Sequence, residues 1–274
     1  MSALEAIILG LVQGFTEFLP ISSTAHLLFI PELAGWEDPG AAFTAITQGG
    51  TLAAVLIYFR VELVEIAVAW TRSLFNRDLR GTENARLGWF IVVGTVPIVI
   101  FGLIFAGDVE TGARNLTLVA ITMIALGLVL LLAEKLAGHT RSMSALTWRD
   151  AIIVGFAQAL ALVPGTSRSG ATLTAGLFLG FKRDDAARYS FLLSIPSVFA
   201  SGAYELGALV SEGTAIEVDT VPLVIATVIA FASGYATIAG LLAFLRTRST
   251  MPFVLYRVVF GGLMLALIAA GAIG

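Results

Sequence analysis

Three ionisable side chains lie at interruptions of apolar sequence and are the residues best placed to do chemistry: Glu17, His26 and Arg168. Ionisable groups within membrane segments are costly, so they are functional candidates by default. The interruptions are FLPISSTAHL (18–27) and LVPGTSRSGATLT (162–174), where proline and hydroxyl residues break two apolar stretches. We therefore expect one polar site built from both interruptions.

Glu17 lies near the C-terminal end of a predicted short helix, where the helix dipole disfavours a negative charge. It therefore requires a nearby cation, either an arginine or a metal ion. Gln13 lies one helical turn earlier and shares a face with Glu17. A plain buried ion pair between Glu17 and Arg168 is the simpler alternative, and the sequence leaves both open.

Hydroxyl residues follow the proline in each interruption. Ser22, Ser23 and Thr24 precede an apolar helix, and one hydroxyl would be enough to cap it. In PGTSRSGAT (164–172), the free amides of a helix N-terminus stand beside a guanidinium and several hydroxyls, which is a combination suited to phosphate. The alternative is a second helix cap followed by a packing face of small residues.

The composition indicates a membrane protein. Of 274 residues, 58% are hydrophobic and 13% are charged, whereas soluble domains carry about 25% charged residues. The mean hydropathy is +0.93. The absence of cysteine excludes disulfides and thiolate sites, and two histidines exclude a multi-histidine metal centre. A net charge of −3 without a basic run indicates no nucleic-acid partner.

Six apolar stretches have the length needed to cross a bilayer. The mixed charges of segment 60–86 predict a hydrated loop between two of these stretches. The predicted spans cover residues 41–59, 87–106, 116–133, 189–209, 221–245 and 253–273.

Segments 3–35 and 150–181 are each broken in the middle, which predicts two re-entrant helix pairs. They also resemble one another: EAIILGLVQ (5–13) and DAIIVGFAQ (150–158) share five of nine residues. Three spans follow each pair, so the two halves must have opposite orientations. The predicted fold is an all-α polytopic membrane protein with an inverted repeat. It forms a single membrane domain (1–274) with halves 1–140 and 141–274.

Loop charges predict the orientation. Segments 60–86, 134–150, 182–188 and 246–248 hold 13 of the 16 Lys and Arg residues, which places them in the cytoplasm by the positive-inside rule. The first re-entrant pair then enters from outside. We therefore expect a multi-pass protein of the cell membrane with its active site on the extracytoplasmic side.

The motifs QGFTEFLPISSTAHL (13–27) and PGTSRSGAT (164–172) resemble the two signatures of the undecaprenyl-diphosphate phosphatase family, also called the bacitracin-resistance protein family. The similarity covers nearly the whole chain, including the repeat. It implies a polyprenyl diphosphate lipid carrier as substrate, cleaved to the monophosphate and phosphate and so recycled for cell-wall synthesis.

The resemblance also implies residue roles. The family's essential serine, histidine and arginine match Ser23, His26 and Arg168, and its second acidic position matches Glu17. Its first acidic position, glutamate or glutamine, is Gln13 here. A divalent cation, Mg²⁺ or Ca²⁺, would bind Glu17 and Gln13, with one carboxylate fewer than in relatives that have two. The implied phosphate-binding residues are Ser167, Arg168, Ser169, Gly170 and Thr172.

The residue types agree with this chemistry, because cleaving a phosphoanhydride requires charge stabilisation and an in-line nucleophile. Ser23 activated by His26 is one route. Direct attack by water with His26 as base is another, and His26 acting as the acid for the leaving group is a third.

A flippase or transporter of a polyprenyl phosphate or another anionic lipid is the alternative function, since inverted repeats with broken helices are typical of transporters. A carrier has no use for a nucleophile beside a histidine. The expected partners are the lipid substrate, membrane lipids and a second copy in a homodimer.

Overall fold

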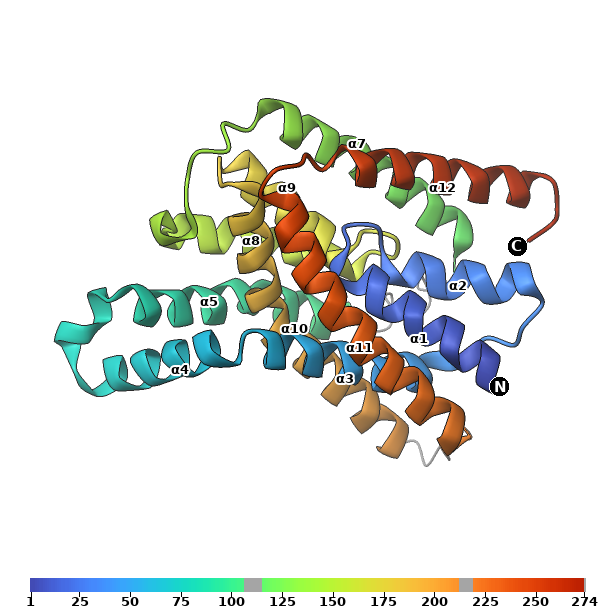
Figure 1. Cartoon of the computed structure of the whole chain (residues 1–274), viewed down its shortest axis with the longest axis horizontal. Coiled ribbons are helices and arrows are strands. Elements are labelled where there is room, and N and C mark those ends of the chain that lie inside the picture. Colours follow the sequence, from blue (N-terminus) through green and yellow to red (C-terminus); the bar gives the residue numbers. More distant parts are fainter. Residues whose placement is uncertain (106–114, 212–218, 274) are drawn as a thin grey trace.

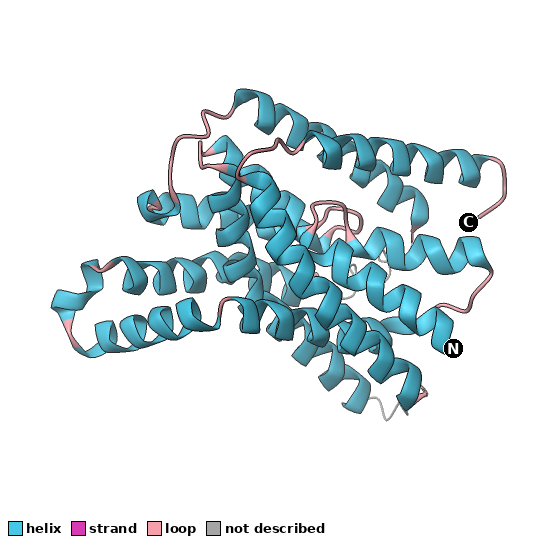
Figure 2. Cartoon of the chain, in the orientation of Figure 1, coloured by secondary structure: helices cyan, strands magenta, loops and turns pink. Residues whose placement is uncertain are grey.

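The computed structural model describes residues 1–105, 115–211 and 219–273. Every regular element of these residues is a helix (Figure 2). Short 3₁₀ turns lie at Arg77–Gly81, Met143–Ala145 and Leu160–Leu162. The α-helices are α1 (Ala3–Phe18), α2 (Ser23–Ala34), α3 (Gly40–Tyr58), α4 (Arg60–Phe75), α5 (Glu83–Ile104), α7 (Leu116–Leu136), α8 (Trp148–Ala159), α9 (Arg168–Phe178), α10 (Arg183–Ser211), α11 (Thr220–Leu245) and α12 (Met251–Ala269).

Two helix hairpins, α1–α2 and α8–α9, occupy the broken segments. Each opens with a capping box, Ser2 with Glu5 and Thr147 with Asp150, which satisfies the first backbone N–H groups of the helix. The hairpins approach from opposite sides, and their turns meet in the centre of the molecule (Figure 1). These helices are too short to cross a bilayer alone, as the breaks predicted.

The two turns share an unusual backbone. Ser22 and Ser167 cap α2 and α9, and each has a positive φ, 73° and 67° respectively. This region is uncommon for residues other than glycine and is often found at functional sites. Each serine side chain accepts a hydrogen bond from the first turn of its helix, from the N–H of Ala25 or Gly170.

Close approaches at glycine hold each hairpin to a long helix. A Cβ at Gly10 of α1 would lie 2.6 Å from the carbonyl oxygen of Ala226 in α11. A Cβ at Gly155 of α8 would lie 2.6 Å from the carbonyl oxygen of Gly94 in α5. Small residues permit such contacts between membrane helices. The first arm of each hairpin is therefore fixed directly against another helix.

Among the described residues, four helices are long and apolar enough to cross a membrane, and they coincide with four of the predicted spans with slightly shifted ends. They are α5, α7, α11 and α12. The stretches predicted at 41–59 and 189–209 are helical, in α3 and α10, but they are not among these four. The protein is a multi-pass membrane protein.

The prediction of a hydrated loop at 60–86 is wrong. Segment Arg60–Phe75 forms helix α4, which packs against α5. Glu62 of α4 also accepts a hydrogen bond from Arg188 of α10 at 3.1 Å. Several of the charged residues that suggested a loop, including Arg60, Glu62 and Arg72, lie on this helix, and its Ile66 is buried at 5% exposure.

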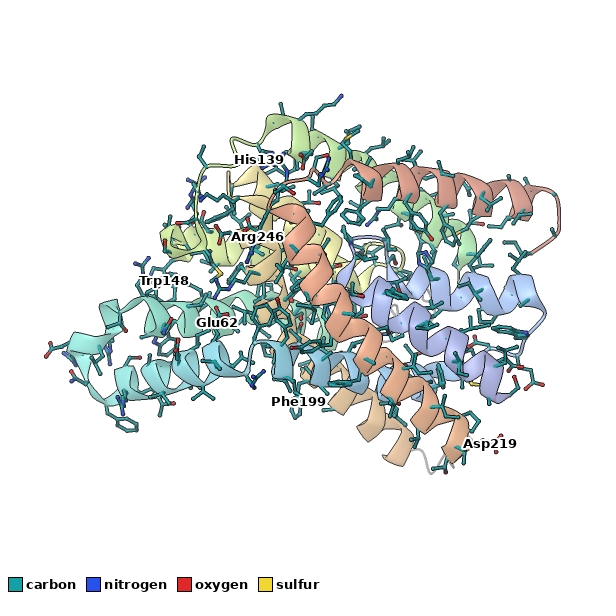
Figure 3. The ribbon with its side chains drawn as sticks, viewed as in Figure 1. Glu62, His139, Trp148, Phe199, Asp219 and Arg246 are labelled. Carbon is teal, nitrogen blue, oxygen red and sulfur yellow. The ribbon has the colours of Figure 1, made fainter. Side chains whose placement is uncertain are left out.

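The basic connections 134–150, 182–188 and 246–248 lie near one another, because Arg183 pairs with Glu134 and Arg246 pairs with Asp184. Arg246 lies at one end of α11 and Asp219 at the other, and His139 and Trp148 lie at the Arg246 end (Figure 3). The predicted outer segment 107–114 and residues 212–218 of the predicted outer segment 205–219 fall outside the described residues. The basic connections 134–150, 182–188 and 246–248 thus belong to one end of the bundle.

We expect Gly10→Ala to lower the stability of the folded protein. The new Cβ would clash with backbone atoms of α11, which cannot move aside as a flexible side chain can. Overpacking of this kind costs about 1–3 kcal/mol. Gly240→Ala is the matched control, since a Cβ at Gly240 meets no atom within 4 Å. Thermal unfolding in detergent should show a lower midpoint for Gly10→Ala alone. Equal midpoints for the two variants would contradict the close packing of α1 and α11.

Candidate functional site

A cavity of about 330 Å³ lies where the two hairpin turns meet. Its polar wall includes Glu17, Ser23, Ser167, Arg168 and Ser197. Its other wall is apolar and comes from the last turns of α5 and the second half of α10, with Ile98, Val99, Leu103 and Ala200. The cavity therefore combines a polar wall with an apolar wall, as a site for an amphipathic molecule requires.

Glu17 and Arg168 form an ion pair between the two hairpins. Their side chains are 7% and 16% exposed, so the pair is mostly shielded from solvent. The contact confirms that both interruptions of the sequence build one site. It also satisfies the need of Glu17 for a cation at its helix end.

The guanidinium of Arg168 has a second set of partners. It donates to the hydroxyl of Ser197 on α10 at 3.4 Å, and Ser197 donates to Gln158 of α8 at 3.1 Å. Gln158 in turn donates to the carbonyl of Gly94 on α5 at 3.3 Å, so it makes interhelical hydrogen bonds. This chain of bonds holds the planar group of Arg168 at the cavity wall.

Glu17 connects the remaining polar groups of the first hairpin. One carboxylate oxygen accepts from the hydroxyl of Ser23 at 3.0 Å and from the amide of Gln13 at 3.1 Å. Its other oxygen pairs with Arg168. A carboxylate bonded to a serine hydroxyl is arranged to receive that proton.

His26 does not contact Ser23 through a hydrogen bond. Its Nδ1 lies 2.7 Å from the carbonyl oxygen of Ser22, and its Nε2 lies 2.6 Å from the hydroxyl of Tyr256 on α12. The ring stacks on Phe260 at 4.5 Å and lines a separate apolar groove between α1, α2 and α12. The predicted Ser23–His26 pair is therefore absent from this arrangement, because the hydroxyl of Ser23 bonds to Glu17 and both ring nitrogens of His26 have other partners.

Only part of the predicted phosphate-binding set reaches the cavity. Ser167 and Arg168 line it. Ser169 instead donates to the carbonyl of Leu19 at 3.0 Å and joins the two turns. The hydroxyl of Thr172 bonds within α9 and to Ser190 of α10 at 2.5 Å. The N–H of Gly170 donates to Ser167.

The residues around Glu17 offer hard oxygen ligands for a divalent cation, but few of them. Gln13 is fully buried, and its Oε1 has no hydrogen-bond partner among the described residues. The described residues hold no cluster of three or more His, Cys, Asp or Glu side chains that could bind a metal. One carboxylate and one amide oxygen fit Mg²⁺ or Ca²⁺ when substrate oxygens and water supply the other ligands.

Comparison with known proteins identifies the family. The family model of the bacitracin resistance protein BacA matches residues 6–263. The chain belongs to this family. It is 54% identical to an undecaprenyl-diphosphatase of Myxococcus xanthus, over 99% of this chain and 91% of that protein. A relative of the same name from Prosthecochloris aestuarii is 51% identical over 99% of both chains. Undecaprenyl-diphosphatase 2 of Streptomyces avermitilis is 48% identical over 100% of this chain and 97% of that one.

Sequence reasoning missed several residues at the site of this BacA family member. Ser197 of α10 and Gln48 of α3 line the cavity, and neither was among the predicted site residues. Arg257 is buried beside both turns, bonded to Pro20 and Thr166. An arginine within the apolar stretch 253–273 was the available signal, by the same rule that selected Glu17.

We expect Arg168→Lys to fail nearly as badly as Arg168→Ala, with turnover about 100-fold below that of the unmodified protein. Lysine keeps the charge but loses the planar fork that joins two partners at once. Arg188→Lys is the matched control, since Arg188 pairs with Glu62 away from the cavity. Phosphate release from a polyprenyl diphosphate measures the effect. Near-normal turnover in Arg168→Lys would mean that Arg168 contributes only its positive charge and not the geometry of its guanidinium.

Proposed function

We propose that this protein hydrolyses undecaprenyl diphosphate to the monophosphate and phosphate, and so recycles the lipid carrier of cell-wall synthesis. The observation that carries the proposal is the set of bonds around Glu17, which joins the hydroxyl of Ser23 to the guanidinium of Arg168 at one cavity. The names of the curated relatives support the substrate. The apolar wall of the cavity suits a prenyl chain.

Substrate binding would rearrange the ion pair. A diphosphate carries more negative charge than a carboxylate and offers oxygens for a bidentate contact, so it competes with Glu17 for Arg168. The N-terminus of α9 adds backbone N–H groups and the positive end of its dipole. Once Arg168 binds phosphate, Glu17 keeps Ser23 and Gln13 as partners, and its second oxygen is released from the guanidinium.

Two routes for the nucleophile follow from this geometry. In the first, Ser23 attacks the terminal phosphorus while its proton passes to Glu17, and the bond to the bridging oxygen breaks to release the lipid monophosphate. Water then cleaves the phosphoserine. In the second, Glu17 takes the proton of a water molecule that attacks directly. In both routes His26 holds the carbonyl of Ser22 and thereby the turn that carries Ser23.

A divalent cation, Mg²⁺ or Ca²⁺, would be held by Glu17 and by the unpaired Oε1 of Gln13. When bound, it supplies positive charge to the phosphate oxygens. The protein's own part is to present these two oxygens on one face of α1, one helical turn apart. Because Arg168 also pairs with Glu17, the cation and the guanidinium would bind the same carboxylate group.

The proposed membrane arrangement is an inverted repeat with halves 1–140 and 141–274, each with a re-entrant hairpin and three spans, in the cell membrane. The hairpins that enter from opposite sides support it (Figure 1). So do the matching serines with positive φ at the two turns. A homodimer stays a prediction.

We also propose that the cavity opens to the extracytoplasmic side. It is lined by the last turns of α5 and the second half of α10, at the ends remote from Glu83 and Arg183. The basic connections lie at the other end, which the positive-inside rule assigns to the cytoplasm.

Phosphate release by the purified protein tests the function. We expect hydrolysis of undecaprenyl diphosphate and its loss in Ser23→Ala or Glu17→Gln. Ser201→Ala, which changes a hydroxyl at the cavity rim, should remain active. Transbilayer movement of a polyprenyl phosphate in vesicles without phosphate release would instead support a flippase.

Cysteine labelling tests the orientation, and the chain has no native cysteine to confuse it. A membrane-impermeant thiol reagent should label Ala34→Cys in intact cells but not Asn76→Cys or Gly138→Cys. All three positions are exposed. Permeabilised cells provide the control, since every variant should then react. The reverse pattern in intact cells would place the active site on the cytoplasmic face.

A further inference from the structure

Arg257 is a buried arginine that the mechanism above does not use. It is 1% exposed and lies in the second turn of α12, inside a candidate membrane span. The hydrogen bonds found for its guanidinium within the described residues all go to backbone carbonyls. They are 3.0 Å to Met123, 3.2 Å to Pro20, 3.2 Å to Gly165 and 3.0 Å to Thr166. Burying a charged guanidinium is costly, so the position of Arg257 inside the protein indicates a specific role.

Three of the four carbonyl groups that Arg257 binds come from the two hairpin turns, and the fourth belongs to Met123 of α7. Pro20 belongs to the turn between α1 and α2, and Gly165 and Thr166 belong to the turn between α8 and α9. One Arg257 nitrogen, Nη1, donates to Pro20 and Thr166 together. A single planar group thus sets the distance between the two turns that carry Ser23 and Arg168.

Glycines shape the slot that holds Arg257. A Cβ at Gly170 would lie 2.9 Å from Nη1 of Arg257. A Cβ at Gly127 of α7 would lie 3.1 Å from the Cβ of Arg257. Gly165 has a φ of +84°, and a Cβ there would lie 2.4 Å from the carbonyl oxygen of Val119. The turn therefore approaches both α7 and Arg257 more closely than other residues allow.

The direction of these carbonyls determines the direction of neighbouring N–H groups. The C=O and N–H of a trans peptide point in opposite directions, and the described residues contain no cis peptide. Because the Thr166 carbonyl faces Arg257, the N–H of Ser167 faces away from Arg257. Gly165, Thr166 and Ser167 all line the cavity, so this N–H is directed to the cavity side of the turn.

We propose that Arg257 is a positioning residue for the reaction. It fixes the peptide planes at 165–167 so that the N–H of Ser167 and the N-terminus of α9 bind the transferred phosphoryl group, and it holds the second turn in register with Ser23. The proposal rests on the proposed function. Donors fixed before the reaction stabilise charge that develops in the transition state, so the effect should appear mainly in kcat.

The test compares Arg257→Lys with Arg248→Lys, an exposed arginine beyond the end of α11. Lysine keeps the charge of Arg257 but cannot reach four carbonyls from one plane. We expect kcat to fall about 100-fold in Arg257→Lys. We expect KM for undecaprenyl diphosphate and the inhibition constant of inorganic diphosphate to rise together by a smaller factor, about three- to tenfold. Arg248→Lys should match the unmodified protein. Thermal unfolding gives the folded fraction, to which each rate is normalised.

Arg257→Lys with a normal kcat and a normal diphosphate inhibition constant per folded molecule would overturn the proposal and leave Arg257 a purely structural residue. If Arg257→Lys does not fold, Gly127→Ala decides, because it displaces the arginine without removing it. Its control is Gly262→Ala on α12, where a Cβ meets no atom within 4 Å. We expect a three- to tenfold lower kcat for Gly127→Ala only, and equal rates would overturn the proposal.

If the unmodified protein releases no phosphate from undecaprenyl diphosphate, the proposed function fails. The role of Arg257 at the anion site is then tested separately by direct binding of inorganic diphosphate. Weaker binding in Arg257→Lys than in Arg248→Lys would support the positioning of the second turn, and equal binding would overturn it.

Discussion

Helices that end in the middle of a membrane protein leave backbone groups that lipid cannot satisfy, and the centre of this molecule is organised by that constraint. Ser22 and Ser167 cap the second arm of each hairpin from an uncommon backbone conformation. Arg257 of α12 donates hydrogen bonds to carbonyl groups of both turns. With the backbone satisfied by these few groups, the turns can lie side by side and leave their remaining polar side chains for a ligand.

The ion pair between Glu17 and Arg168 is the part of this centre that a ligand can change. A buried pair contributes little net stability, because desolvation of both groups offsets their attraction. The two residues of the pair have different further partners. Arg168 donates to Ser197, which is bonded to Gln158, whereas Glu17 accepts a hydrogen bond from the hydroxyl of Ser23. An anion that replaces Glu17 at Arg168 would therefore leave a carboxylate already bonded to a nucleophile. In the proposed mechanism, substrate binding and activation of Ser23 are thus coupled through one exchange of partners.

His26 and Arg257 lie on the far side of the first turn from the cavity. His26 bonds to the carbonyl of Ser22 and to Tyr256, and its ring is packed on Phe260. Helix α12 thus supplies both Tyr256, which bonds to His26, and Arg257, which bonds to both turns. This arrangement separates groups that face the ligand from groups that hold the backbone, and it explains why two ionisable residues near the site are absent from its lining.

The sequence by itself indicated the class of protein, the two broken segments and the candidates Glu17 and Arg168, because low charge, proline breaks and ionisable residues in apolar sequence are local signals. The choice of Ser23 among three adjacent hydroxyl residues came from the family resemblance. The sequence also predicted that the breaks meet, since the repeat implies opposite entry. Only the tertiary structure decided that Glu17, rather than His26, bonds to Ser23, that Thr172 turns towards α10, and that Arg257 joins both turns. These outcomes depend on which helix faces which, and that is fixed by close contacts such as Gly10 with Ala226, far apart in the chain. Residue types reveal which groups are costly to bury, but the partners that satisfy them come from packing.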